Sequence, residues 1–327
     1  MTGQREQALH DTEGWFRRHG LPYFVESERQ HVRRALGRAR LVPLFAVALV
    51  VGAAAGVVVG LLTTVSGGLV VGLLVAGGVV AVYAGGTLRV HGIARWALGR
   101  TFRSLGLLFP LITRALPLLL LFITFLFINT EVWMVADSLD PGVLALAVMF
   151  FAVLATGFLL VRLPEELDRV DDDLDRGRLV ARCKGTPLEA TAEEVFREAS
   201  EDDLGGIVEV TGLQKWNLVL VLLVSQAVQV FLLSLAVLLF FLVFGSVVMD
   251  KDVVEAWLGH DVQSVPGLAG LTTSLVKVSV FLAGFSGLYF TVYAVTDETY
   301  RAQFFTSVTH ELERAVAVRA VYRQMNR

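Results

Sequence analysis

Long apolar blocks alternate with polar segments along the chain, and this alternation is typical of helices that cross a membrane. One crossing takes roughly 20 apolar residues of helix. Six blocks are long enough: 41–64, 67–86, 115–136, 143–163, 217–249 and 268–296. The last two exceed what a bilayer requires, so we expect those helices to tilt or to project beyond it. The pattern predicts an all-α polytopic membrane protein with six transmembrane helices.

The polar segments predict helices at the membrane surface and in the cytoplasm. Residues 1–40 form two short amphipathic helices, separated by a glycine and a proline that end the first. The segment 87–114 interleaves basic and apolar residues, which is typical of a helix lying at the membrane interface. We expect an acidic, helical segment at 164–216 and a C-terminal helix at 297–327.

Basic residues gather on alternate sides of the predicted spans and indicate their orientation. Arginines are frequent in the N-terminal segment, in 87–114, in 164–216 and after the last span. The other loops hold a single cation, Lys251, among several carboxylates. Cytoplasmic loops carry the excess of basic residues. We therefore predict that both termini are cytoplasmic, with four spans in 41–163 and two in 217–296.

The composition agrees with a membrane protein and limits other classes of function. Of 327 residues, 55% are hydrophobic and 18% are charged, and the mean hydropathy is +0.64. Soluble domains carry about 25% charged residues. A net charge of −3 is too small to indicate a nucleic-acid partner. Cys183 is the only cysteine, so no disulfide or thiolate metal cage forms within one chain.

Three stretches resemble a group of bacterial membrane proteins. They are RALPLLLLFITFLFINTEVW, LVSQAVQVFLLSLAVLLFFLVFG and TDETYRAQFF. They are similar to uncharacterised multi-spanning integral membrane proteins of actinobacterial type. The abundance of Arg over Lys agrees with a GC-rich bacterial genome. The resemblance implies a bacterial cell membrane and a multi-span architecture, and it implies no activity or site.

Small residues recur at every fourth position on three predicted spans. This spacing places them on one helix face and lets helix backbones approach closely in lipid. The positions are Gly52, Gly56 and Gly60; Gly68, Gly72 and Ala76; and Ser279, Ala283 and Gly287. Static close packing is the simpler interpretation, and sliding of helices in a transporter is the alternative.

Three polar residues interrupt apolar blocks near the predicted outer face. Asn129 and Glu131 lie roughly 8–10 Å inside the end of the third span, and Lys277 lies roughly 13 Å inside the sixth. A charge at the bilayer centre costs about 2.5–3.5 kcal/mol, so such groups pair or face water. We expect Glu131 and Lys277 to meet if these spans are neighbours. They form either a permeation site or a static pair, unless Glu131 lies at the interface.

Gln226 and Gln229 lie about one turn apart on the fifth span, roughly 14–18 Å from its cytoplasmic end. Together with nearby serines, they are candidates to line an aqueous path. In other bundles such amides hydrogen-bond between helices and contribute about 1 kcal/mol each. The sequence leaves both interpretations open.

The acidic run DRVDDDLDRGR provides weak candidates for a cation site. Asp171, Asp172 and Asp175 carry oxygen ligands that suit divalent cations. However, the run lacks the glycine and the spacing of an EF-hand loop. Alternating Asp and Arg is more typical of a solvated helix face. We therefore expect no metal and no cofactor.

The sequence carries no signature of the common catalytic sites. The histidines are scattered, and no Gly-x-Ser-x-Gly, phosphate-binding Gly-Lys-Ser/Thr or His-Glu-x-x-His motif is present. We expect no enzymatic activity. The leading hypothesis is a channel or transporter for ions or small solutes, and the alternative is a non-transporting membrane scaffold or interaction protein. The lipid bilayer is the expected partner, and a homo-oligomer or a cytoplasmic protein partner stays open.

Overall fold

The chain folds into α-helices. The computed structural model describes residues 2–103, 120–172, 176–198, 209–267, 270–296 and 298–326. Within these ranges there is no β-strand, and an isolated bridge joins Ser264 to Thr272. The helices outside the long apolar segments are α1 (Thr2–Arg18), η1 (Pro22–Phe24), α2 (Glu26–Ala35), α5 (Val90–Arg103), α9 (Arg176–Arg182), α10 (Glu189–Glu198), α13 (Lys251–Leu258) and α15 (Glu298–Met325).

Five of the described helices are long and apolar enough to cross a membrane. They are α3 (Arg38–Leu62), α4 (Val65–Thr87), α8 (Pro141–Asp172), α12 (Gly212–Val248) and α14 (Thr273–Thr296). Each corresponds to one predicted span, and the prediction of an all-α polytopic membrane protein is confirmed. α12 has 37 residues. Its length of about 55 Å exceeds a hydrocarbon core of about 30 Å.

The third predicted span, 115–136, is not one straight helix. Two short helices, Leu120–Phe127 and α7 (Thr130–Ser138), meet at an angle of 73°. Asn129 lies at the break, where its Oδ1 accepts hydrogen bonds from the N–H groups of Glu131 at 2.8 Å and Val132 at 3.4 Å. The asparagine therefore caps α7 and ends the preceding helix. Residues 104–119 lie outside the described residues.

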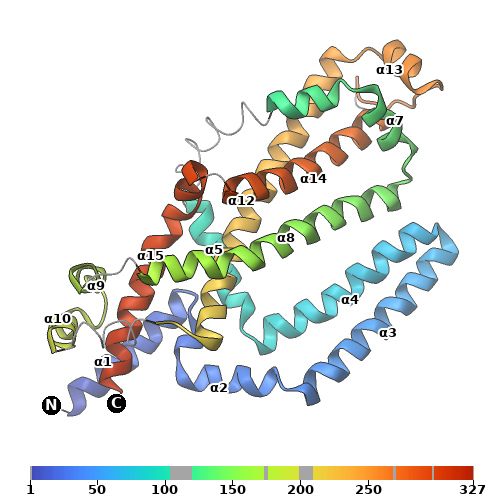
Figure 1. The fold of residues 1–327 in the computed structure, drawn as a ribbon. Coiled ribbons are helices and arrows are strands. Elements are labelled where there is room, and N and C mark those ends of the chain that lie inside the picture. Colours follow the sequence, from blue (N-terminus) through green and yellow to red (C-terminus); the bar gives the residue numbers. More distant parts are fainter. Residues whose placement is uncertain are drawn as a thin grey trace.

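The long helices form two groups (Figure 1). α3 and α4 make a hairpin, whereas α8, α12 and α14 pack together and carry α7 and α13 at one end. α4 joins the two groups through contacts with α8 and α5. The apolar segment of α14 is 50% buried, whereas those of α3 and α4 are 11% and 6% buried. The hairpin therefore presents most of its apolar surface to lipid.

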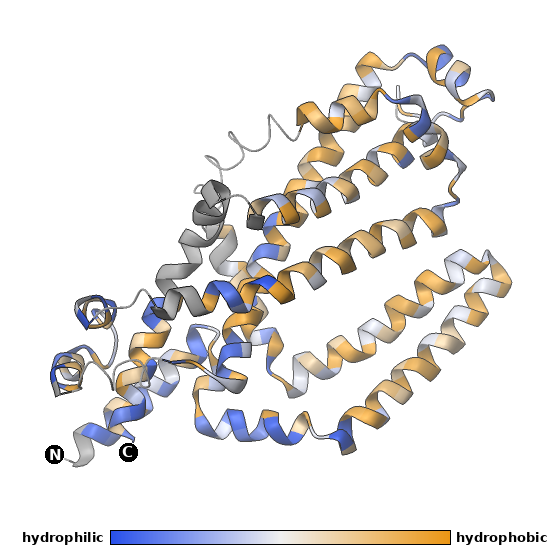
Figure 2. Ribbon diagram, viewed as in Figure 1, coloured by the Kyte–Doolittle hydropathy of each residue, from blue (hydrophilic) through white to orange (hydrophobic). Residues whose placement is uncertain are grey.

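Polar residues gather at the end of the bundle that holds both chain termini (Figure 2). We call it the terminal end; α1, α2, α9 and α10 lie there, and α7 and α13 lie at the opposite end. An aromatic cluster packs α1 against η1 and α15. The ring centroid of Phe16 lies 5.4 Å from that of Phe24 and 5.7 Å from that of Tyr322.

Asn217 of α12 fixes the N-terminal segment to the bundle. Its Oδ1 accepts a hydrogen bond from Tyr23 N at 2.9 Å, and its Nδ2 donates to Gly20 O at 2.8 Å. Gly20 has a φ of +71°, a conformation that favours glycine. These contacts place α2 beside the start of α12 and next to the end of α15.

Candidate functional site

One face of α12 carries buried polar side chains in the half nearer the terminal end. Separations of three and four residues bring such positions to one side of a helix. We call this surface the polar face of α12; it consists of Gln214, Asn217, Ser225 and Gln229, each exposed by 8% or less, and Gln226 is buried beside it.

The hydrogen bonding of the polar face changes with depth. Near the terminal end, Gln214 Oε1 accepts from Arg319 Nε at 2.8 Å, and Asn217 holds the N-terminal segment. Deeper in the bundle, Ser225 Oγ and Gln229 Oε1 are buried and have no hydrogen-bond partner among the described residues. Lipid cannot satisfy such groups, and each costs about 1–3 kcal/mol when unsatisfied.

α14 runs antiparallel to α12 and carries a buried polar group in the other half of the bundle. Gly287 of α14 lies against Ser234, and Leu275 near its start lies against Gly245 near the end of α12. Ser279 therefore lies in the half of the bundle away from the termini. It is 0% exposed, and its Oγ has no hydrogen-bond partner among the described residues.

Two other hydroxyls of α14 are satisfied within their own helix. Ser286 Oγ donates to Leu282 O at 2.6 Å, and Thr291 Oγ1 donates to Gly287 O at 2.7 Å. Hydroxyls that bond back to the preceding turn in this way need no solvent. The unsatisfied hydroxyls of Ser225 and Ser279 are therefore distinct from ordinary buried serines and threonines in this bundle.

At the opposite end, Lys277 is held by Asp137 and not by Glu131. Its Nζ donates to the main-chain oxygen of Asp137 at 2.6 Å and lies 3.9 Å from Asp137 Oδ1. The other carboxylate oxygen, Oδ2, lies 2.9 Å from His260 Nε2. These three side chains, which we call the outer cluster, join α7 and α14 to the loop after α13.

Two acceptors raise the pKa of His260 above its ordinary value. The main-chain oxygen of Asp261 lies 3.0 Å from Nδ1, and the Asp137 carboxylate faces Nε2. A protonated imidazole donates from both nitrogens, so both contacts favour the charged form. The outer cluster therefore keeps its imidazolium to a higher pH than an isolated histidine would.

Asn129 and Glu131 lie together at the start of α7 and away from Lys277. Asn129 is the N-cap of this helix, and Glu131 is an exposed residue of its first turn. A carboxylate there is favoured by the partial positive charge of the helix N-terminus. No ion pair joins Glu131 to a cation within the described part of the chain. The geometry gives both residues a role in starting the helix.

Glycines form the contact between α3 and α4. A Cβ atom added to Gly68 would lie 2.5 Å from Gly56 O, and one added to Gly52 would lie 2.7 Å from Gly72 O. The Cα of Gly60 would lie 2.7 Å from a Cβ on Gly68. The two backbones touch, which is the geometry that small residues allow between helices in lipid.

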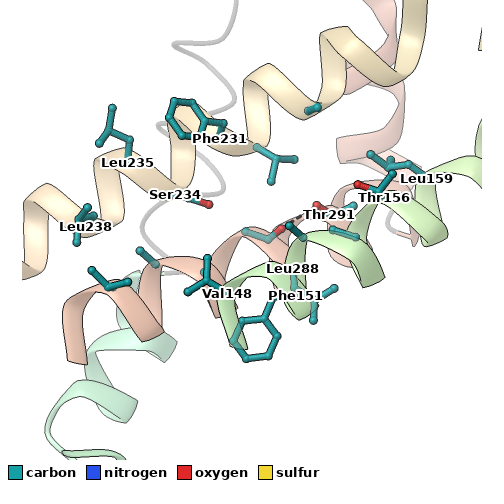
Figure 3. A pocket seen from close by; sticks show the side chains of 18 residues that line it. Val148, Phe151, Thr156, Leu159, Phe231, Ser234, Leu235, Leu238, Leu288 and Thr291 are labelled. Atoms are coloured by element: carbon teal, nitrogen blue, oxygen red, sulfur yellow. Dashed lines mark hydrogen bonds between the residues drawn. The ribbon is translucent and has the colours of Figure 1, made fainter. Parts of the chain in front are cut away.

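An apolar cleft of about 320 Å³ lies between α8, α12 and α14 (Figure 3). Ala283 and Gly287 line it from α14, where a Cβ on Gly287 would collide with Ser234 Oγ. Phe231 at its edge is 65% exposed. The cleft therefore opens on the apolar, lipid-facing surface and not on the polar face of α12.

The described residues of the acidic run do not form a metal site. Asp171 and Asp172 are the last residues of α8, and Asp175 lies outside the described residues. Among the described residues, no group of three or more His, Cys, Asp and Glu side chains is arranged to hold a metal ion.

Asp137 and His260 are site residues that the sequence pattern does not single out. One local signal was available for the first. Asn followed by Thr and Glu is typical of a helix start, and a new helix from Thr130 places Asp137 two turns further on. His260 carries no such signal, because its contact with Asp137 depends on how α7 and α13 pack.

Comparison of the chain with known proteins finds no relative. No family model matches the chain, and no curated protein or solved structure matches it. Its own geometry therefore carries the functional inference. The chain is a multi-pass, all-α membrane protein whose two central helices, α12 and α14, bury polar atoms in both halves of the bundle.

Proposed function

We propose that the protein is a channel or transporter that moves ions or small solutes through the bundle, past the buried polar groups of α12 and α14. Three buried polar atoms support this proposal, because Ser225 Oγ, Gln229 Oε1 and Ser279 Oγ have no hydrogen-bond partner among the described residues. Native structures leave few such groups, and each requires an explanation such as water, an ion or a functional role. Polar groups that face the interior of a membrane bundle are typical of solute pathways. Water or a solute inside the bundle would supply the missing hydrogen-bond partners.

The proposed orientation has both termini in the cytoplasm and α7 and α13 outside the cell membrane. Arginines at the terminal end, such as Arg29, Arg33 and Arg323, support it, since cytoplasmic segments carry the basic excess. In this orientation, the polar face of α12 begins at the cytoplasmic side. The outer cluster of Asp137, His260 and Lys277 then lies at the other mouth.

A non-transporting membrane scaffold is the second candidate, and the outer cluster favours it. Lys277 donates to a main-chain oxygen of Asp137, a contact that fixes α14 against α7. A scaffold needs no path through the bundle, and its polar side chains only hold helices in register.

Solute flux into proteoliposomes separates the two candidates. Purified protein is reconstituted, and uptake of labelled Na⁺, K⁺, Cl⁻, phosphate and small amino acids is compared with that of protein-free liposomes. Gln229→Leu removes a polar atom of the path, and Glu131→Gln changes an exposed carboxylate outside it. We expect wild-type flux of at least one solute, about tenfold less in Gln229→Leu, which corresponds to roughly 1.4 kcal/mol on the barrier, and unchanged flux in Glu131→Gln.

Two results contradict the transport proposal. One is wild-type flux equal to that of protein-free liposomes for every solute tested. The other is wild-type flux that Gln229→Leu and Ser225→Ala leave unchanged. Either result favours the scaffold.

A further inference from the structure

A second cavity, of about 510 Å³, lies at the terminal end where α2, α12 and α15 meet. Its lining is polar, unlike that of the cleft between α8, α12 and α14. We call it the basic cavity after its arginines, which are Arg29, Arg33, Arg319 and Arg323. Its volume suits a small ligand or the headgroup of a lipid.

The described lining of the basic cavity carries an excess of positive charge. Arg29 and Arg33 lie one turn apart on α2, and Arg319 and Arg323 lie one turn apart on α15. Like charges at this spacing repel and destabilise a helix. Glu26 is the one carboxylate of the described lining, and it pairs with Arg29. An anion between the two helices would relieve the repulsion on both.

Burial increases the effect of these charges. Arg319 is 4% exposed, and it donates to Gln214 Oε1 at 2.8 Å and to Glu209 O at 2.9 Å. These contacts orient the guanidinium at the wall of the cavity. Burial, followed by the charges of Arg33 and Arg323, lowers the pKa of Arg29 from its ordinary value.

The start of α12 adds hydrogen-bond donors to the same cavity. Residues 211–214 line it, and the first N–H groups of a helix have no acceptor within the helix. The side chain of Thr211 makes no capping hydrogen bond to them. Helix N-termini and guanidinium groups both bind phosphate oxygens, the first through N–H groups and the second through paired donors.

An exposed tryptophan places the cavity at the level of the lipid headgroups. Trp216 lies one turn after Gly212 on α12 and is 51% exposed. Tryptophan rings prefer the boundary between the hydrocarbon and the headgroups. The cavity therefore lies within reach of both a lipid phosphate and a soluble phosphate compound.

We propose that the basic cavity is a binding site for a phosphate-bearing anion, supplied either by the headgroup of an anionic lipid or by a soluble phosphate compound. The arginines of α2 and α15 bind its oxygens from two sides, and the start of α12 binds it from a third. This assignment does not depend on transport, because neither Ser225 nor Gln229 lines the cavity.

Binding is measured on the full chain in nanodiscs. Inorganic pyrophosphate is titrated into discs of neutral phosphatidylcholine by calorimetry, and the retention of phosphatidylglycerol from mixed discs is measured by native mass spectrometry. Arg33→Gln with Arg323→Gln removes two exposed lining charges with little effect on folding. Arg38→Gln with Arg40→Gln makes the same change in net charge at exposed positions outside the lining, and it serves as the control.

We expect the wild type to bind pyrophosphate or to retain phosphatidylglycerol. The Arg33/Arg323 variant should do so about tenfold more weakly, because it loses two charge-assisted contacts, and the control should match the wild type. Pyrophosphate binding in neutral discs identifies a soluble anion, whereas lipid retention without pyrophosphate binding identifies a headgroup. The proposal is overturned if the wild type binds neither probe, or if the Arg33/Arg323 variant and the control bind equally.

Discussion

The two antiparallel helix pairs of the bundle, α3–α4 and α12–α14, are held together in different ways. In α3–α4 the backbones touch, and a Cβ on Gly56 would lie 2.9 Å from Gly68 O. In α12–α14, the side chains of Leu275 and Ser234 lie against Gly245 and Gly287 of the facing helix. The apolar segment of α14 is 50% buried, against 6% for α4. The first pair depends on the shape of its glycine faces, and the second on burial within a larger core.

The comparison shows that helices of this protein pack closely without buried polar groups. Between residues 38 and 87, all of which are described, no polar side chain is buried. α12 and α14 carry several, among them Ser225, Gln229 and Ser279. Close packing alone therefore does not require such groups, which supports the proposed path for water or solute.

The largest loss of stability is expected from a substitution in the contact between α3 and α4. Gly68→Ala places a methyl group 2.5 Å from Gly56 O, and such overpacking costs about 1–3 kcal/mol. Gly77→Ala on the same helix has no atom within 4 Å of the new methyl group, so its stability should be unchanged or slightly higher. Chemical unfolding in detergent measures both variants, and equal stability would refute the glycine contact.

A smaller loss of stability is expected from substitutions at the break before α7, the helix that carries Asp137 of the outer cluster. Asn129→Ala removes the acceptor for the N–H groups of Glu131 and Val132, and a lost N-cap costs about 1 kcal/mol. Asn129→Asp keeps an acceptor and should retain most of the stability. The same unfolding measurement applies, and a neutral Asn129→Ala would show that the bend does not need its cap.

Removal of an unsatisfied polar group from α12 should raise stability, whereas the two substitutions above lower it. Ser225→Ala removes a buried hydroxyl that has no partner among the described residues, so stability should rise by roughly 0.5–1 kcal/mol, while solute flux falls. Ser286→Ala is the control, because its hydroxyl donates to Leu282 O at 2.6 Å, and it should bring no gain. A loss of stability in Ser225→Ala would indicate a purely structural role.

The smallest effect concerns the pH dependence of the outer cluster. The folded-state pKa of His260 is raised, so its contribution to stability is fully present below the unfolded value of about 6.5 and is lost as the pH rises through the folded pKa. Asp137→Asn should lower that pKa and leave a smaller shift, because Asp261 O still faces Nδ1. NMR titration measures the pKa of His260, and substitution of the exposed Asp252 by Asn is the control. An unchanged pKa of His260 in Asp137→Asn would contradict the contact between these two side chains.

The apolar helices were the most predictable part of the fold. A run of apolar residues such as 217–249 has to be helical in lipid, because every backbone polar group needs a partner within the segment. The corresponding helix, Gly212–Val248, starts only five residues earlier. Spacing also carries information within such helices, since the fourfold spacing of Gly52, Gly56 and Gly60 places these residues on one face.

Side-chain partners were less predictable, since they depend on contacts between distant segments. Lys277 was expected to meet Glu131, but the bend at Asn129 turns α7 so that Asp137 lies against α14 instead. The basic cavity combines arginines of α2 and α15 with the start of α12, and no local pattern connects positions almost 300 residues apart in the chain.

Thiol labelling tests most directly whether water reaches the polar face of α12. Cys183 is buried, and burial raises its pKa to about 12. We therefore expect it not to react, so that any labelling reports the introduced cysteine. Gln229→Cys lies on the polar face, and Phe231→Cys lies at nearly the same depth on the lipid side, where Phe231 is 65% exposed. A charged, membrane-impermeant thiol reagent should label Gln229→Cys and leave Phe231→Cys unmodified. If neither variant reacts, the polar face of α12 is dry and the account of a solute path is contradicted.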